Sequence, residues 1–87
     1  MHVMHVMDIP PEAALTTVAV RLNGNNYAYI DNHQGVSELT PALIRLKTDQ
    51  GELVFKGEQM LIEVLQGYTL RLRGVIHSVE FKETIHA

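Results

Sequence analysis

One compact polar cluster of this sequence contains a histidine and a carboxylate that could do acid–base chemistry. Asp31, Asn32 and His33 stand together, and a histidine oriented by a carboxylate is a common general base. Consecutive residues of an extended chain point to opposite sides, so Asp31 does not orient the His33 ring through Asn32. The sequence therefore predicts a structured turn, in which Asn32 and Gly35 take unusual dihedral angles and His33 caps or packs. We take Asp31, Asn32, His33 and Gly35 as a candidate interaction or turn motif.

Histidines and tyrosines allow a second interpretation. His2 and His5 are three residues apart, a spacing that suits a metal ion on a helix, but no third ligand stands nearby. Tyr27 and Tyr29 share one face of a predicted strand and could stack on a ligand. The alternative hypothesis is therefore a β-domain that binds a small ligand or a metal through His33 and the nearby tyrosines.

The remaining polar residues form no catalytic set. Glu52, Glu58 and Glu63 are too scattered to act as a pair of carboxylates, and the glycines form no phosphate-binding pattern. The chain has no cysteine, which excludes disulfides and thiolate metal sites. The sequence predicts a protein that is not an enzyme and that needs no cofactor.

Composition describes one small domain. The chain has 87 residues and a formal net charge of −3, so no basic face is demanded and nucleic acid is not an expected partner. Apolar runs are too short to span a membrane, and the N-terminus lacks the pattern of a signal peptide. We expect a cytoplasmic protein with a flexible leader at 1–14, a β-domain at 15–82 and a short tail at 83–87.

Apolar and polar residues alternate along most of the domain, which is typical of half-buried strands. Residues 43–48 and 52–56 alternate on both sides of Asp49-Gln50-Gly51, and 16–22 and 27–31 flank an Asn/Gly-rich turn. Further strands are expected at 36–39, 60–65, 69–73 and 75–81. The predicted class is all-β, a small antiparallel meander of about seven to eight short strands that forms a sandwich or roll. A short β-solenoid is the alternative, because 43–57 and 61–74 resemble each other.

Two sets of strand residues are candidate surfaces. One segment is apolar on both faces, so we expect it to be covered on two sides, by the domain or by a second subunit. Its candidate interface residues are Met60, Leu61, Ile62, Val64 and Leu65. The second set is basic, occupies alternate positions, and could meet an acidic partner if the sheet aligns it. This candidate basic face is Arg45, Lys47, Arg71 and Arg73.

Ordered motifs along the chain resemble a known family. They are Tyr29-Ile-Asp-Asn-His-Gln-Gly35, Thr40-Pro-Ala-Leu-Ile-Arg-Leu-Lys-Thr48, Gly51-Glu-Leu-Val-Phe-Lys-Gly57 and Leu70-Arg-Leu-Arg-Gly-Val-Ile-His-Ser-Val-Glu-Phe81. This order resembles the YabP/YqfC family of sporulation proteins, and more closely its YqfC half, over residues 16–81. Asp31 stands where that pattern has Glu, and Gln34 where it has a basic residue.

The resemblance implies a non-enzymatic protein of endospore-forming bacteria. Such a protein is expected to act in the mother cell during spore development, including formation of the cortex and coat. It implies an assembly or scaffold module that works through protein–protein contacts, with a YqfD-type membrane protein as a candidate partner. Association with the membrane would then come through that partner, and self-association into a homo-oligomer is also expected.

Overall fold

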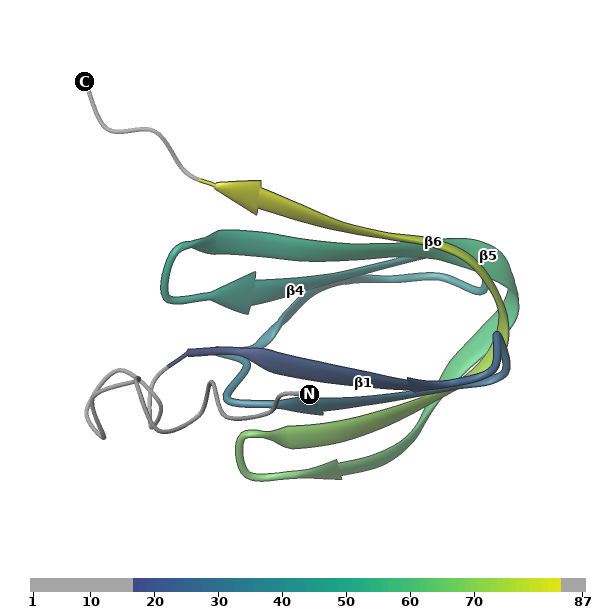
Figure 1. Ribbon diagram of the computed structural model, residues 1–87, viewed down its shortest axis with the longest axis horizontal. Coiled ribbons are helices and arrows are strands. Elements are labelled where there is room, and N and C mark those ends of the chain that lie inside the picture. The colour runs from purple at the N-terminus through teal and green to yellow at the C-terminus, as the bar shows by residue number, and fades with distance from the viewer. Residues whose placement is uncertain (1–16, 84–87) are drawn as a thin grey trace, which may run out of the picture.

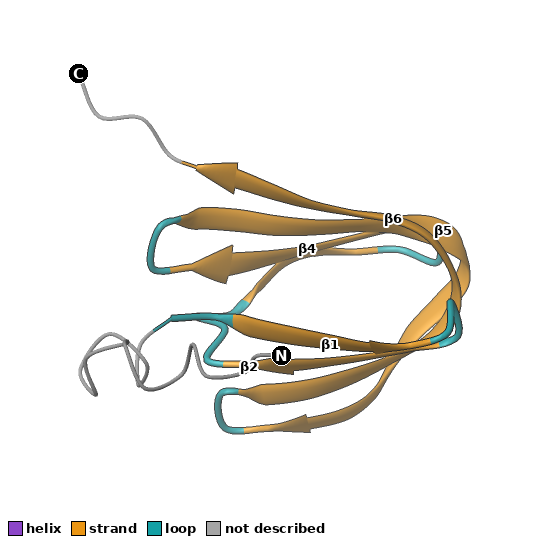
Figure 2. Cartoon of the chain, viewed as in Figure 1, coloured by secondary structure: helices purple, strands orange, loops and turns teal. Residues whose placement is uncertain are grey.

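The computed structural model describes residues 17–83, which form one antiparallel sheet of six strands (Figures 1 and 2). Its strands are β1 (Ala19–Asn23), β2 (Tyr27–Asp31), β3 (Val36–Leu39), β4 (Leu43–Thr48), β5 (Gly51–Gln66) and β6 (Thr69–Glu83). None of the described residues belongs to a helix that could cross a membrane. The predicted leader, and all of the predicted tail except its first residue, lie outside the described residues.

Strand order in the sheet is β1-β2-β6-β5-β4-β3. The two longest strands, β5 and β6, pair along their whole length and bend together in the middle (Figure 1). The bend divides the sheet into two layers. Layer A contains β3, β4, residues 51–56 of β5 and residues 75–83 of β6. Layer B contains β1, β2, residues 69–73 of β6 and residues 61–66 of β5.

Two glycines allow β5 and β6 to approach closely at the bend. A Cβ atom at Gly57 would lie 2.0 Å from the carbonyl oxygen of Val75, and one at Gly74 would lie 2.6 Å from Cα of Met60. Gly74 also has a φ of 151°, which residues with a side chain rarely adopt. The pairing register shifts on both sides of Gly57, so the bend consists of bulges that only glycine accommodates here.

Turns of the neighbouring hairpins satisfy backbone donors of the bend. The amide of Gly57 donates to the carbonyl of Ala42 (3.1 Å), and the amide of Met60 donates to the carbonyl of Pro41 (2.9 Å). In the same way, the amide of Ile76 donates to the carbonyl of Asn25 (2.7 Å). Because unpaired buried donors are costly, these bonds hold the two layers in a fixed relative orientation.

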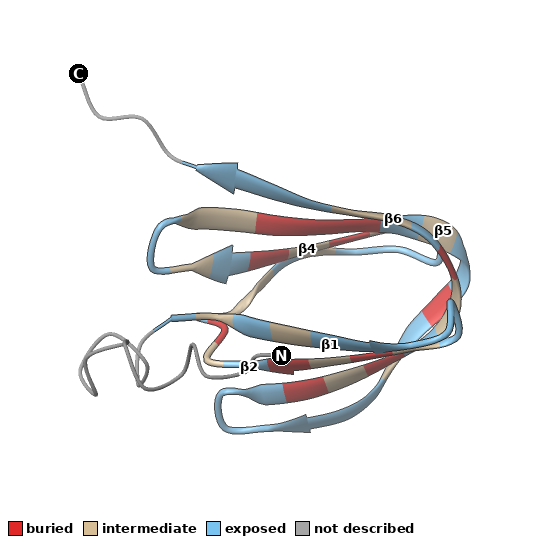
Figure 3. Ribbon diagram, viewed as in Figure 1, coloured by how far each residue is buried: buried red, intermediate tan, exposed pale blue. Residues whose placement is uncertain are grey.

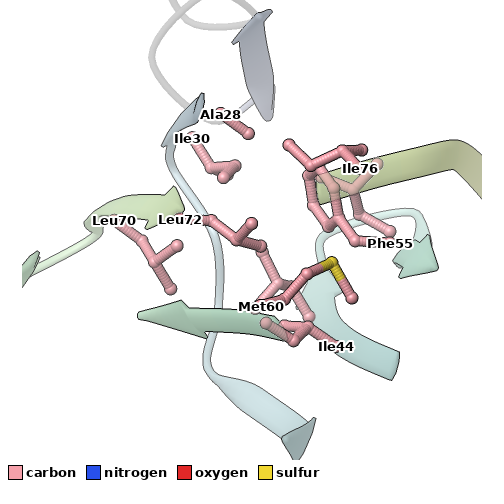
Figure 4. Close-up of a cluster of buried hydrophobic side chains, with 10 residues drawn as sticks. Ala28, Ile30, Ile44, Phe55, Met60, Leu70, Leu72 and Ile76 are labelled. Carbon is pink, nitrogen blue, oxygen red and sulfur yellow. The ribbon is translucent and has the colours of Figure 1, made fainter. Parts of the chain in front are cut away.

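The hydrophobic core lies between the two layers (Figure 3). Figure 4 shows side chains from β2, β4, β5 and β6 that converge on one cluster. Inward positions alternate with outward ones along β2 and β4, as the sequence predicts, whereas the bulges at the bend shift the alternation in β5 and β6. The buried cluster is Ala28, Ile30, Ile44, Leu46, Leu53, Phe55, Met60, Leu70, Leu72 and Ile76.

The predicted all-β antiparallel class is confirmed, with β3 to β6 arranged as a meander. The sheet has six strands where the sequence predicts about seven to eight. The difference arises at Gly57 and Gly74, where the sequence predicts a strand end and a bend between short strands. In the structure both β5 and β6 continue through their glycine. Antiparallel pairing of all neighbours is the arrangement of a folded sheet and not of a solenoid.

Candidate interaction surface

The predicted turn motif connects β2 in layer B with β3 in layer A. Asn32 has a φ of 67° and Gly35 a φ of 125°, the kind of dihedral angle that the sequence predicts for this turn. The amide of Asn32 donates to the carbonyl of Tyr68 (2.8 Å), and its Nδ2 donates to the carbonyl of Thr17 (3.0 Å). These two hydrogen bonds connect the β2–β3 turn to the β5–β6 turn and to the start of the described chain.

Asp31 and His33 have separate partners. The Asp31 carboxylate accepts a hydrogen bond from the Thr69 hydroxyl (3.3 Å), whereas Nδ1 of His33 accepts one from the amide of Gly35 (3.0 Å). The His33 side chain is only 4% exposed, and its Nε2 is buried without a hydrogen-bond partner. Because Nδ1 accepts, the proton of the neutral ring is on Nε2. A ring that is buried and held in this way packs in the turn and is not placed to take a proton from a substrate.

Burial lowers the pKa of His33 below its ordinary value of 6.5. The unfolded chain therefore binds a proton at a higher pH than the folded chain does. The contribution of neutral His33 to the stability of the fold is present above pH 6.5, and it is lost as the pH falls through the pKa of the folded state. We expect the free energy of unfolding to fall as the pH is lowered below 6.5, by at most ~1.4 kcal/mol per pH unit from this group. Urea unfolding at several pH values measures this slope.

Two histidine variants separate His33 from other titrating groups. In His33→Asn the side-chain oxygen can still accept from the Gly35 amide, but the group no longer titrates, so the slope should become smaller. His77, on the outer surface, lies 3.4 Å from Glu58 and serves as the control. A His77→Gln variant should keep the slope that His33 causes. An unchanged slope in His33→Asn would show that the buried ring does not cause the pH dependence.

The apolar segment of β5 lies at the free edge of layer B. Met60 is buried at the bend, but Leu61, Val64 and Leu65 are exposed, as is Tyr68 in the turn that follows. β6 pairs with one side of this segment, and no described strand pairs with its other side. Its role as an interface stays a prediction.

The candidate basic residues are divided between the two layers and face glutamates. In layer A, Arg45 lies between Glu38 (3.5 Å) and Glu52 (2.6 Å), and the Glu52 carboxylate raises the pKa of Arg45 above its ordinary value. In layer B, Arg71 and Arg73 share Glu63, at 2.9 and 3.5 Å. Lys47, two residues after Arg45 on β4, pairs in register with Glu52. The sheet therefore does not align the four residues into one stripe.

The outer face of layer B brings arginines and tyrosines together across three strands. Arg21 of β1 pairs in register with Tyr29 of β2, which pairs with Arg71 of β6. The Arg21 guanidinium lies 4.7 Å from the centre of the Tyr29 ring, and the Tyr27 and Tyr29 rings stack with centroids 6.5 Å apart. We call this surface the Arg–Tyr face and define it as Arg21, Tyr27, Tyr29, Arg71 and Arg73.

The sequence predicts four residues of the Arg–Tyr face as candidate binding residues, but not Arg21. A signal for Arg21 was present, because it stands on the side of its strand opposite Val18, Val20 and Leu22. A hairpin closed at the turn 23–26 places Arg21 opposite Tyr29. The pairing of β2 with β6, which adds Arg71 and Arg73 to the same face, joins segments far apart in sequence and has no local signal.

A metal site is not formed by the residues that the structure describes, since no three histidine, aspartate or glutamate side chains gather there to hold an ion. His2 and His5 of the predicted alternative lie outside the described residues. His33 lies in the turn between the layers. Its side chain accepts a hydrogen bond from Gly35 and not from Tyr27 or Tyr29.

Comparison with known proteins gives the chain a family. The family model described as the YabP family matches residues 15–87. The chain is 26% identical over 78 residues to uncharacterized protein YqfC of Bacillus subtilis (strain 168), an alignment that covers 90% of this chain and 84% of the relative. No solved structure shows a significant match to the chain. Since the family model spans more than half of its length, the chain belongs to the YabP family, which is associated with sporulation.

Proposed function

We propose that this protein is a non-enzymatic assembly module of sporulation that acts in the mother cell, in formation of the spore cortex and coat. Membership of the YabP family supports the link to sporulation. The single structural observation that supports an assembly role is the Arg–Tyr face, which has the residue types that dominate the energetics of protein interfaces.

The geometry of the Arg–Tyr face favours binding of a protein partner. Stacking of Tyr27 on Tyr29, and of Arg21 over Tyr29, holds these side chains before a partner arrives. Less conformational entropy is then lost on binding. Large aromatic side chains bring much contact area with few rotatable bonds.

Charge on the face indicates an acidic partner. Arg21, Arg71 and Arg73 carry three positive charges. Glu63, which pairs with two of them, and Asp31, on the same side of β2 as Tyr29, carry two negative charges, so the net charge of the face is positive. An acidic segment of a partner would therefore meet complementary charge, although the chain as a whole has a net charge of −3. A YqfD-type membrane protein is the partner that we propose, and binding to it would bring this protein to a membrane.

Loss of Arg71 should impair sporulation. In the source bacterium, Arg71→Ala should lower the number of heat-resistant spores at least about tenfold, because truncation of an interface hot spot costs ~2 kcal/mol or more. Arg45→Ala is the matched control, since Arg45 is 38% exposed, Arg71 is 40% exposed, and each pairs with a glutamate on an outer face. Spore counts of Arg45→Ala should stay near those of the parent strain, with both proteins at equal levels by immunoblot.

Deletion of the whole gene tests the broader proposal. A deletion strain should produce few heat-resistant spores, with a cortex or coat defect visible by electron microscopy of thin sections. Normal numbers of heat-resistant spores in the deletion strain would refute a role in spore development. Normal numbers in Arg71→Ala alone would refute only the role of the Arg–Tyr face.

A further inference from the structure

Among the residues that the structure describes, no strand pairs with the outer edge of the second half of β6. Residues 78–83 pair with β5 on one side, whereas β2 pairs only with residues 69–73 (Figure 1). The register with β5 is regular from Ser78 to Glu83. In an antiparallel sheet, backbone groups of alternate residues point away from the paired neighbour. In residues 78–83, the backbone groups that point away from β5 have no strand partner in the described part of the chain. Such an edge can pair with another strand.

Other free edges of the sheet are less suited to pairing with a second strand. The edge of β5 at 61–66 is interrupted by a register shift at Glu63, and β3 has only four residues and a register shift of its own. β1 is regular, but a copy of itself centred on Arg21 would oppose two arginines. Bulges, short strands and like charges all disfavour pairing of edges.

Charges along β6 are complementary to those of an antiparallel copy of β6. The backbone groups that point outward occur on alternate residues. A two-fold axis between two identical strands therefore places one residue directly opposite the same residue of the second copy. An axis at Phe81 places Glu80 opposite Lys82 of the second copy, and Lys82 opposite Glu80 of the second copy. An axis at Glu80 would oppose two glutamates. Opposite charges directly across strands stabilise the pair and like charges destabilise it.

Phe81 gives this edge an apolar contact at the same axis. It pairs in register with Leu53, so it points toward the core side of layer A, yet it is 65% exposed whereas Leu53 is buried. A cavity of about 360 Å³, lined in part by Val18 and Phe81, opens beside it between the layers. A second Phe81 placed opposite the first therefore has space. Paired aromatic side chains stabilise an interface by more than the burial of their surface area alone.

We propose that two copies of this chain form a dimer by antiparallel pairing of residues 79–83 of β6 about a two-fold axis at Phe81. Layer A then continues as one sheet through both copies. On its outer face the row that runs from Lys47 through Glu52 to Lys82 is extended by Glu80 of the second copy, so charges alternate along it. This dimer goes beyond the proposed function and does not depend on a role in sporulation.

Charge exchange tests the dimer. Sedimentation velocity of the full chain over a wide range of concentrations should show a monomer–dimer equilibrium. Glu80→Lys alone, or Lys82→Glu alone, replaces both attractive pairs by repulsive ones and should raise the dimer Kd at least about tenfold. An equimolar mixture of the two variants should dimerise again, because one chain then has two positive side chains on the edge and the other has two negative ones.

A single cysteine tests the register. The sequence contains no cysteine, so Phe81→Cys should form a disulfide dimer under mild oxidation, whereas Leu65→Cys, at the exposed edge of β5, should not. Only monomer at every concentration would overturn the dimer, as would a mixture of the charge variants that associates no better than each alone. Cross-linking at Leu65 in place of Phe81 would move the interface to β5 and overturn the proposal. None of these solution measurements bears on spore counts, so this dimer and the proposed function can fail separately.

Discussion

Gly57→Ala is expected to destabilise the folded protein severely. The added Cβ would lie 2.0 Å from the carbonyl oxygen of Val75, a distance that real side chains do not reach. Since that oxygen is backbone on the paired strand, relief requires β5 and β6 to separate at the bend. The same movement would break the bond from the Gly57 amide to the Ala42 carbonyl. We expect a loss of more than about 3 kcal/mol, a large part of the stability of a small domain.

Gly67→Ala is the matched control for Gly57→Ala. Gly67 has a φ of 61°, and nothing lies within 4 Å of a Cβ added there. The substitution should therefore cost only the backbone strain of a left-handed residue, about 1 to 2 kcal/mol. Urea unfolding followed by circular dichroism measures both variants. If Gly57→Ala lost no more stability than Gly67→Ala, close contact of the strands at the bend would not be what requires glycine.

Local features of the fold follow from the sequence because they depend on neighbouring residues. Alternation of apolar and polar residues predicts β1, β2 and β4, and the Asn/Gly turn at 23–26 and the turn at 49–51 predict the hairpins that join them to their neighbours. The same local signals mislead at Gly57 and Gly74. A glycine between two strand patterns indicates a break, whereas its function here is to let two paired strands approach, which depends on Val75 and Met60.

In the candidate surfaces, too, the sequence predicts the features that depend on neighbouring residues and misses those that depend on the pairing of distant strands. Alternation correctly puts Arg71 and Arg73 on an outer face, but only the pairing of β2 with β6 brings them beside Tyr29 and Tyr27. The separation of Arg45 from Arg71 likewise depends on the bend, which puts β4 and the first half of β6 in different layers. Charge patterns of a single strand, such as Glu80 and Lys82, are visible in the sequence. Which strand edge remains free is decided by the topology.

Two phenylalanines give the second large prediction, because they differ mainly in burial. Phe55 is fully buried between the layers (Figure 4), and Phe81 is 65% exposed at the edge of β6. Phe55→Ala should lower the free energy of unfolding by about 3 to 5 kcal/mol, through lost transfer energy and the cavity that remains. Phe81→Ala should change the stability of the monomer by no more than about 0.5 kcal/mol. Thermal or urea unfolding at low protein concentration, where monomer dominates, measures both.

Protein concentration distinguishes the two roles further. Dimerisation of the folded chain adds stability that grows with concentration, whereas a contact within one chain does not. The midpoint of thermal unfolding should therefore rise with concentration in the parent protein and in Phe55→Ala, but much less in Phe81→Ala. An equal rise in all three would mean that Phe81 is not at the interface. A large loss of monomer stability in Phe81→Ala would mean that this ring already serves the core, and the free edge of β6 would then lack its apolar contact for a second copy.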